Sequence, residues 1–122
     1  MQATTELSVA QIQAAVREAK EAAYEAADNF FKTKLGGRDQ YACGFAWVNI
    51  YEHNGVKLKG NTRMGRAMKA AGIRQDYTKS FQIWNPSGYA CQNVDTLEAG
   101  ARAAADVFKK YGFTAYAGSR LD

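Results

Sequence analysis

One segment of the chain, residues 41–51, gathers side chains that suit the binding of a flat, polar molecule. Its sequence, Tyr-Ala-Cys-Gly-Phe-Ala-Trp-Val-Asn-Ile-Tyr, alternates with a period of two residues. Successive side chains of a strand point to opposite faces of a sheet, so the even positions form a small-residue face and the odd positions an aromatic face. The aromatic face carries Phe45, Trp47 and the single amide Asn49. We expect both faces to be covered, the small one by a closely packed helix and the aromatic one by core, a second subunit or a ligand.

Other rings, amides and arginines of the chain could complete such a site. Aromatic faces stack on a nucleotide base, amides hydrogen-bond its edge, and guanidinium groups bind phosphate oxygens in pairs. The candidates are the rings Phe45, Trp47, Tyr51, Phe81 and Trp84, the amides Asn49, Asn85, Gln92 and Asn93, and the arginines Arg63, Arg66 and Arg120. Asp122 could accept a hydrogen bond from a ribose hydroxyl. The alternative for each ring is packing in the core, and for Arg120 it is a salt bridge.

Arg120 stands two residues from the end of the sequence, directly after a predicted strand. This position indicates that the last residues are held in place rather than frayed. We therefore expect Arg120 to belong to the site.

Positive charge is concentrated in one part of the chain. Between Val56 and Lys79 there are seven lysines and arginines and a single acid, Asp76, in a chain of net charge +4. Such a cluster favours an anionic partner, and it is equally typical of a solvated face that keeps a protein soluble. Nucleic-acid binding by residues 57–79, with aromatic side chains stacking on bases, is the alternative function.

The motifs of common enzyme classes are missing from the sequence. It contains no phosphate-binding loop signature, no HExxH and no CxxC, and its one histidine, His53, falls in a predicted turn. Cys43 and Cys91 are predicted to be buried, reduced thiols. We expect a protein that binds without catalysis and that uses no metal and no cofactor.

The pattern of elements predicts an α+β fold in one domain, residues 1–122. Ser8 and Gln11 form a capping box, so a helix should run from Val9 to Gly36, giving a helical segment 1–36. Residues 41–122 should form a small, mainly antiparallel sheet with two shorter helices. The predicted strands are 41–52, 79–84, 89–94 and 113–119, and the predicted helices are 62–71, capped by Asn61, and 96–111, capped by Asp95.

The first helix is long for a domain of this size. At 1.5 Å per residue it should measure about 40 Å, while the radius of gyration of 122 residues is near 14 Å. We therefore expect a homo-oligomer, with the outer part of this helix in the contact. The sequence does not say whether the assembly stops at two copies.

Several short segments resemble small proteins encoded by bacteriophages. They are Cys43-Gly-Phe-Ala-Trp-Val, Lys57-Leu-Lys-Gly, Trp84-Asn-Pro, Gln92-Asn93, Glu98-Ala-Gly-Ala and Ser119-Arg-Leu-Asp. The layout is also similar to that of the phage anti-Thoeris sponge proteins, with a long helix against an antiparallel sheet. That resemblance implies a dimer or a hexamer that sequesters a cyclic ADP-ribose immune messenger without cleaving it. It further implies that the aromatic and amide groups hold the adenine, while Arg120 and Asp122 hold phosphates and ribose near a subunit boundary.

The expected location is the cytoplasm of the infected host. No apolar run approaches the roughly 20 residues of a membrane span, and residues 1–7 lack the basic start and apolar core of a signal peptide. The identity of the bound cyclic nucleotide stays open, as does a second site in the basic cluster.

Overall fold

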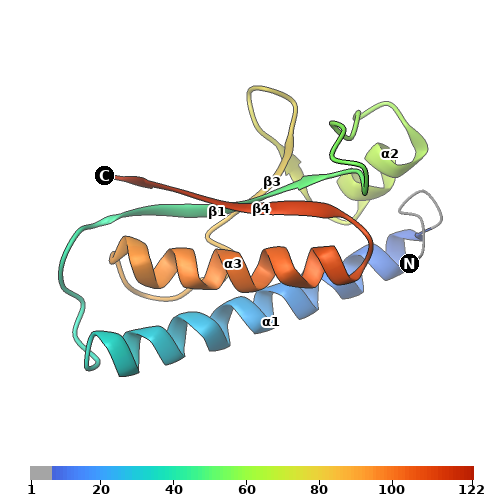
Figure 1. Cartoon of the computed structure of the whole chain (residues 1–122). Coiled ribbons are helices and arrows are strands. Elements are labelled where there is room, and N and C mark those ends of the chain that lie inside the picture. The colour runs from blue at the N-terminus through green and yellow to red at the C-terminus, as the bar shows by residue number, and fades with distance from the viewer. Residues whose placement is uncertain (1–6) are drawn as a thin grey trace.

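A four-stranded antiparallel sheet, two stacked helices beneath it and a short helix at one end make up the computed structural model, which describes residues 7–122 (Figure 1). The predicted α+β class is confirmed. Residues 1–6, which belong to the predicted helical segment 1–36, lie outside the described residues. In chain order the elements are α1 (Val9–Lys34), β1 (Gly44–Tyr51), α2 (Arg63–Ala70), β2 (Arg74–Gln75), β3 (Phe81–Trp84), α3 (Val94–Lys110) and β4 (Thr114–Leu121).

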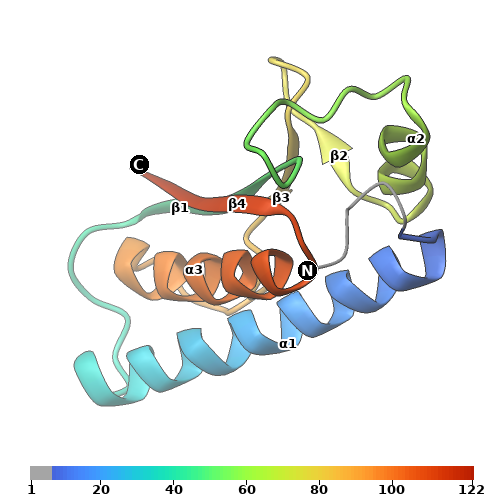
Figure 2. The ribbon, with the colours of Figure 1, turned by 45° about the vertical axis from the view of Figure 1, so that its right-hand side comes forward.

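The long helix α1 begins where the sequence predicts. The Ser8 hydroxyl accepts from the Gln11 backbone N–H, and the Gln11 side chain accepts from the Ser8 backbone N–H. The buried stripe of α1 consists mostly of alanines, and such small side chains allow a close approach of two helices. Figure 2 shows α1 crossing beneath α3 and extending past it toward α2. Because other parts of the same chain pack along it, α1 does not protrude as a free arm.

The sheet is ordered β2-β3-β1-β4 and all of its pairs are antiparallel. Even-numbered residues of β1, among them Val48 and Ile50, are fully buried against the helix layer. The odd-numbered residues are half-buried or exposed. Helices occupy only one side of the sheet, so of the three covers expected for the aromatic face, packing in the core is wrong, and a second subunit or a ligand stays a prediction.

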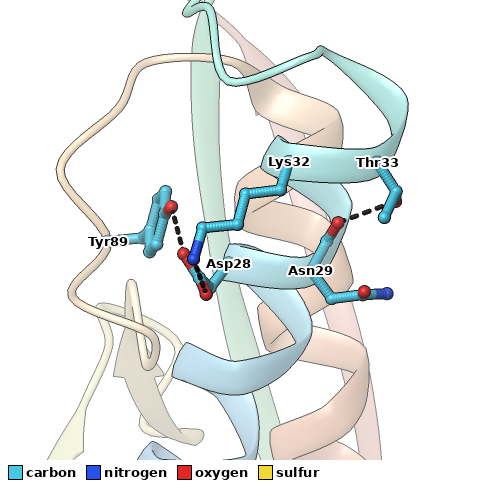
Figure 3. A network of polar contacts seen from close by, with 5 residues as sticks. All are labelled: Asp28, Asn29, Lys32, Thr33 and Tyr89. Atoms are coloured by element: carbon cyan, nitrogen blue, oxygen red, sulfur yellow. Dashed lines mark hydrogen bonds and ion pairs between the residues drawn. The ribbon is translucent and has the colours of Figure 1, made fainter.

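The segment between β3 and α3 is a loop rather than the predicted strand 89–94. Cys43 and Asn93 form an isolated bridge, and Tyr89 turns toward α1. The Tyr89 hydroxyl donates to Asp28 at 2.6 Å (Figure 3). The Tyr89 ring also lies 5.4 Å from that of Phe31. Asp28 also pairs with Lys32 at 2.9 Å. This network fastens the loop to the C-terminal half of α1.

Both shorter helices begin at a different cap from the predicted one. Thr62, not Asn61, caps α2 through a hydrogen bond from the Gly65 backbone N–H. Asn93, not Asp95, caps α3, so this helix starts at Val94. The strands also shift: residues 41–43 precede β1, and Tyr41 has a positive φ of 66°.

Candidate functional site on the open face of the sheet

The face of the sheet that no helix covers collects most of the predicted rings, and we call it the open face. In the strand register, Phe45 lies beside Arg120, Trp47 lies between Trp84 and Gly118, and Asn49 lies between Gln82 and Tyr116. Phe45, Trp84 and Tyr116 are 38%, 51% and 57% exposed. Antiparallel pairing thus brings residues from three separate segments of the chain onto one surface.

The rings at one end of this face form a cluster with a cation. The Trp47 and Trp84 rings lie 5.1 Å apart with their planes tilted by 33°, and the Phe45 ring meets Trp84 edge-on at 6.0 Å. The Arg120 guanidinium lies 5.4 Å from the Phe45 ring centre and 6.0 Å from that of Trp84. Such cation–π contacts position the guanidinium, whose planar N–H groups suit the binding of an anion.

Gly118 makes room for one of these rings. A β-carbon at residue 118 would lie 2.4 Å from the Trp47 indole nitrogen, closer than any real contact. The indole therefore rests directly on the backbone of β4. This arrangement gives the open face a flat floor next to Arg120.

Two amides meet at the centre of the open face. The Gln82 side-chain N–H donates to the Asn49 side-chain oxygen at 3.0 Å. Among the described contacts, this bond leaves the Asn49 amide donors and the Gln82 carbonyl oxygen for a further partner. A donor and an acceptor side by side match the hydrogen-bonding edge of a nucleobase.

A hairpin between β2 and β3 forms a wall above this floor. Residues 76–80 rise on the side of the sheet opposite to α1 and α3 (Figures 1 and 2). Together with the open face they line a half-open hollow of about 580 Å³. Its lining comprises Trp47, Asn49, Tyr51, Asp76, Tyr77, Thr78, Ser80, Gln82, Trp84 and Arg120. The volume lies within the range of 300–1,000 Å³ that is typical of small-molecule sites.

The electrostatic character of the hollow changes from one end to the other. Arg120 supplies positive charge near the rings. At the hairpin, hydrogen bonds from the Thr78 hydroxyl and from the backbone N–H groups of Thr78 and Ser80 lower the pKa of Asp76, which keeps it ionised. An anionic group is therefore favoured at the Arg120 end, and hydroxyl donors are favoured at the hairpin end.

Two predicted site residues lie in the interior instead. Phe81 is fully buried on the helix-facing side, because it pairs with Ile50. Asn93 is 1% exposed, and its side chain caps α3 at the Thr96 N–H and donates to the Gln40 carbonyl. Both side chains have structural roles, so we exclude them from the site.

The remaining predicted residues lie outside the hollow. Asn85 occupies the turn after β3 with a φ of 42°, and its side-chain oxygen accepts from Ser87. Gln92 contacts the Cys43 thiol, and the Asp122 backbone N–H donates to the Cys43 carbonyl. Cys43 is exposed and Cys91 is partly exposed, so the prediction of two buried thiols is wrong.

Arg63 and Arg66 are far from Arg120. Both lie on α2, where they line a shallow hollow with the first residues of α1. In Figures 1 and 2, α2 and the C-terminus mark opposite ends of the sheet. The structure therefore divides the predicted arginines into two groups, of which only Arg120 lies with the rings.

A second hollow of about 560 Å³ lies at the other edge of the sheet. It is lined by parts of α1, the end of α2 and β3, including Lys20 and Arg74. Its only aromatic side chain is Trp84, which it shares with the open face. Because its lining lacks Trp47, Asn49 and Arg120, we assign the candidate site to the open face.

The structure adds site residues that the sequence did not single out. They are Gln82, Gly118 and the hairpin residues Asp76, Tyr77, Thr78 and Ser80, which line or support the hollow. The period of two in residues 81–84 could have indicated Gln82 as a neighbour of Trp84 on the same face. For Gly118 the sequence offers no comparable signal.

Within residues 7–122, no group of three or more His, Cys, Asp and Glu side chains is arranged to hold a metal ion. No helix in that same range is long and apolar enough to cross a membrane.

Comparison of the chain with protein-family models, with curated proteins and with solved structures finds no match.

Proposed function

We propose that this protein binds a cyclic nucleotide of the cyclic ADP-ribose type on its open face and sequesters it without catalysis. The observation that carries the proposal is the grouping of the neighbouring Trp47 and Trp84 rings, an amide pair and Arg120 around one hollow of about 580 Å³. These are the three kinds of group that a purine nucleotide needs for stacking, base-edge recognition and phosphate binding.

The placement of the ligand follows from the electrostatic difference across the hollow. A phosphate would lie at the Arg120 guanidinium, which is held by Phe45 and Trp84. The base would lie on the exposed face of Trp84 and reach the amides of Asn49 and Gln82. Ribose hydroxyls would then face Asp76 and the hairpin.

The biological role rests on the resemblance to phage anti-Thoeris sponge proteins. Under this proposal the protein acts in the cytoplasm of an infected host and lowers the concentration of an immune messenger. A sponge must hold its ligand intact, so the bound molecule should leave unchanged when the protein unfolds.

Single-stranded nucleic acid is the second candidate ligand, and one observation favours it. Phe45, Trp84 and Tyr116 are exposed on the same sheet face, and successive bases can stack on such rings. Of the basic residues in 57–79, Arg63, Arg66 and Lys69 lie on α2 at one end of this sheet, and Lys57 donates to the Thr78 carbonyl in the hairpin. A nucleic-acid complex would differ from a sponge in its steep dependence on salt.

The binding test compares two arginine variants. We expect cyclic ADP-ribose isomers at micromolar concentration to raise the melting temperature of the wild-type protein and to be recovered intact after heating. Arg120→Ala should weaken binding by about tenfold or more, because a charged hydrogen-bonding partner of the phosphate is removed. Binding is measured by titration calorimetry, and the released ligand is identified by mass spectrometry.

Arg66→Ala is the matched control, since Arg66 lies on α2 and donates to the Asn61 carbonyl. It should bind as the wild type does. Equal binding by wild type and Arg120→Ala would remove Arg120 from the site. Recovery of a cleaved ligand would contradict a sponge, and salt-sensitive binding of oligonucleotides alone would favour the second candidate.

A further inference from the structure

The outer edge of β4 is a long strand edge that pairs with no other strand of the sheet. β4 is the last strand on its side of the sheet, and it runs for eight residues, Thr114–Leu121. Its sequence, Thr-Ala-Tyr-Ala-Gly-Ser-Arg-Leu, contains no proline and no lysine. Proteins commonly place proline or lysine on exposed edge strands, because an unprotected edge pairs readily with another strand.

The register shows which backbone groups point outward. Asp122 donates its backbone N–H to the Cys43 carbonyl, and Gly44, opposite Leu121, donates to Gln92 on the other side of β1. Antiparallel pairs alternate between hydrogen-bonded and non-hydrogen-bonded residues. Residues 115, 117, 119 and 121 therefore direct their N–H and C=O groups away from β1, toward the outer edge.

We infer that β4 pairs with β4 of a second copy of this chain, antiparallel about a two-fold axis at Gly118. In this register every outward-pointing backbone group of residues 115, 117, 119 and 121 has a partner. Ala117 pairs with the partner's Ser119, and Ala115 pairs with the partner's Leu121. It forms about eight backbone hydrogen bonds between the two copies. The two four-stranded sheets become one continuous sheet with a shared open face.

An exposed leucine and a groove fit each other in the same register. Leu121 is 67% exposed, whereas Ala115 on the same side of β4 is fully buried against the helix layer. Next to Ala115, a groove of about 330 Å³ is lined by Ala105 of α3 and Ala117 of β4, with Arg102, Asp106, Lys109 and Tyr116 at its other walls. Because the partner's Leu121 is opposite Ala115, its side chain enters this groove. The pairing of the backbones and the burial of the leucine thus require the same axis.

The pairing also adds a residue to the candidate site. On the open face it places the partner's Tyr116 directly opposite Arg120, in a non-hydrogen-bonded pair where side chains are closest. The guanidinium, already in contact with Phe45, would gain a third ring on its free side. This addition to the site depends on the proposed function, but the dimer itself does not.

The first test measures assembly of the full chain by sedimentation equilibrium. The wild type should have twice the chain mass of 13.4 kDa at micromolar concentration. Leu121→Glu should raise the dimer dissociation constant by roughly 100-fold or more, since a carboxylate would enter the alanine-lined groove. Val56→Glu replaces another exposed apolar residue, 51% exposed and in the turn after β1 rather than on β4, and should stay dimeric. Circular dichroism confirms that each variant is folded.

The second test measures the register by cross-linking. In a chain whose native cysteines are serines, Tyr116→Cys combined with Arg120→Cys should oxidise to a covalent dimer. Non-hydrogen-bonded pairs have Cα atoms about 4.5 Å apart, within the range of a disulfide. Tyr116→Cys alone should stay uncrosslinked, because the residue opposite position 116 in the second copy is then still Arg120.

The outcomes separate this inference from the proposed function. A monomeric wild type, or a dimer that Leu121→Glu leaves intact, overturns the inference. A Leu121-dependent dimer without the double-cysteine cross-link overturns its register. A dimer that fulfils both tests but binds no cyclic nucleotide supports the inference and counts against the proposed function alone.

Discussion

The contact between Trp47 and Gly118 decides the shape of the open face at the level of single residues. The indole lies where any larger side chain at 118 would stand. It also lies 5.1 Å from the Trp84 ring, and Trp84 together with Phe45 holds Arg120. A larger side chain at residue 118 would therefore displace Trp47, and through the contact of Trp47 with Trp84 it would shift the Arg120 guanidinium.

Gly118→Ala should displace the Trp47 indole and weaken nucleotide binding without unfolding the protein. Loss of one well-placed stacking surface costs about 1–3 kcal/mol, which corresponds to roughly 5- to 150-fold in affinity. The coupled circular dichroism signal of the two tryptophans should also diminish. Ser119→Ala is the control, because Ser119 faces α3 and bonds to Glu98. Unchanged binding and an unchanged tryptophan signal in Gly118→Ala would contradict this account.

Sequence alternation at the residue level could identify only part of the site. Residues 45, 47 and 49 were assigned to one face because their strand is long and strictly alternating. Phe81 was assigned with them because of its type, yet its pairing with Ile50 places it in the core. The register of β3 depends on the hairpin 76–80, which local composition does not specify.

The elements of the fold depend on caps that hold the helices in place beneath the sheet. Asn93 is the clearest case, since its side-chain oxygen accepts from both the N–H and the hydroxyl of Thr96, at 2.8 Å each. Its amide also donates to the Gln40 carbonyl. One buried side chain thus starts α3 and fixes the segment that leads into β1.

Asn93→Ala should lower the free energy of unfolding by about 2 kcal/mol, at the upper end of the range for a lost N-cap, because the amide bond to Gln40 is lost as well. Urea unfolding measures this change, and its slope should stay constant. Asn93→Ser keeps a neutral cap acceptor and loses the donor to Gln40, so it should cost less. A loss below about 0.5 kcal/mol in Asn93→Ala would show that the cap is not needed.

Helices were the most predictable elements, because capping signals and periodicity are local. The capping box at Ser8 located the start of α1, and Gly112 correctly followed the end of α3. The prediction for residues 89–94 was wrong, since Tyr89 bonds to Asp28 far away in the sequence. The two-residue strand β2 was missed because such a short segment has no measurable alternation.

At the scale of the whole molecule, the charged groups that join distant segments should limit the pH range of stability. Glu18 joins α1 to α3 through Lys110, Asp28 joins α1 to the 85–93 loop through Tyr89, and Asp76 closes the hairpin. Hydrogen bonds from Lys110, Tyr89 and Thr78, respectively, lower the pKa of each carboxyl group below its ordinary value of 3.8 to 4.5. The same Asp28 contact raises the pKa of Tyr89 to about 12.

The urea midpoint should therefore form a plateau between about pH 5 and pH 10 and fall on both sides. A lowered carboxyl pKa stabilises the fold fully above its ordinary value, and that contribution disappears as the pH falls through the folded value. The raised pKa of Tyr89 acts in the opposite direction: its contribution is complete below about pH 10 and is lost as the pH rises toward about 12. Asp28→Asn should flatten the acid side and Tyr89→Phe the alkaline side. If neither variant changed the profile, the Asp28–Tyr89 contact would not be present in solution, and the 85–93 loop would need another attachment to α1.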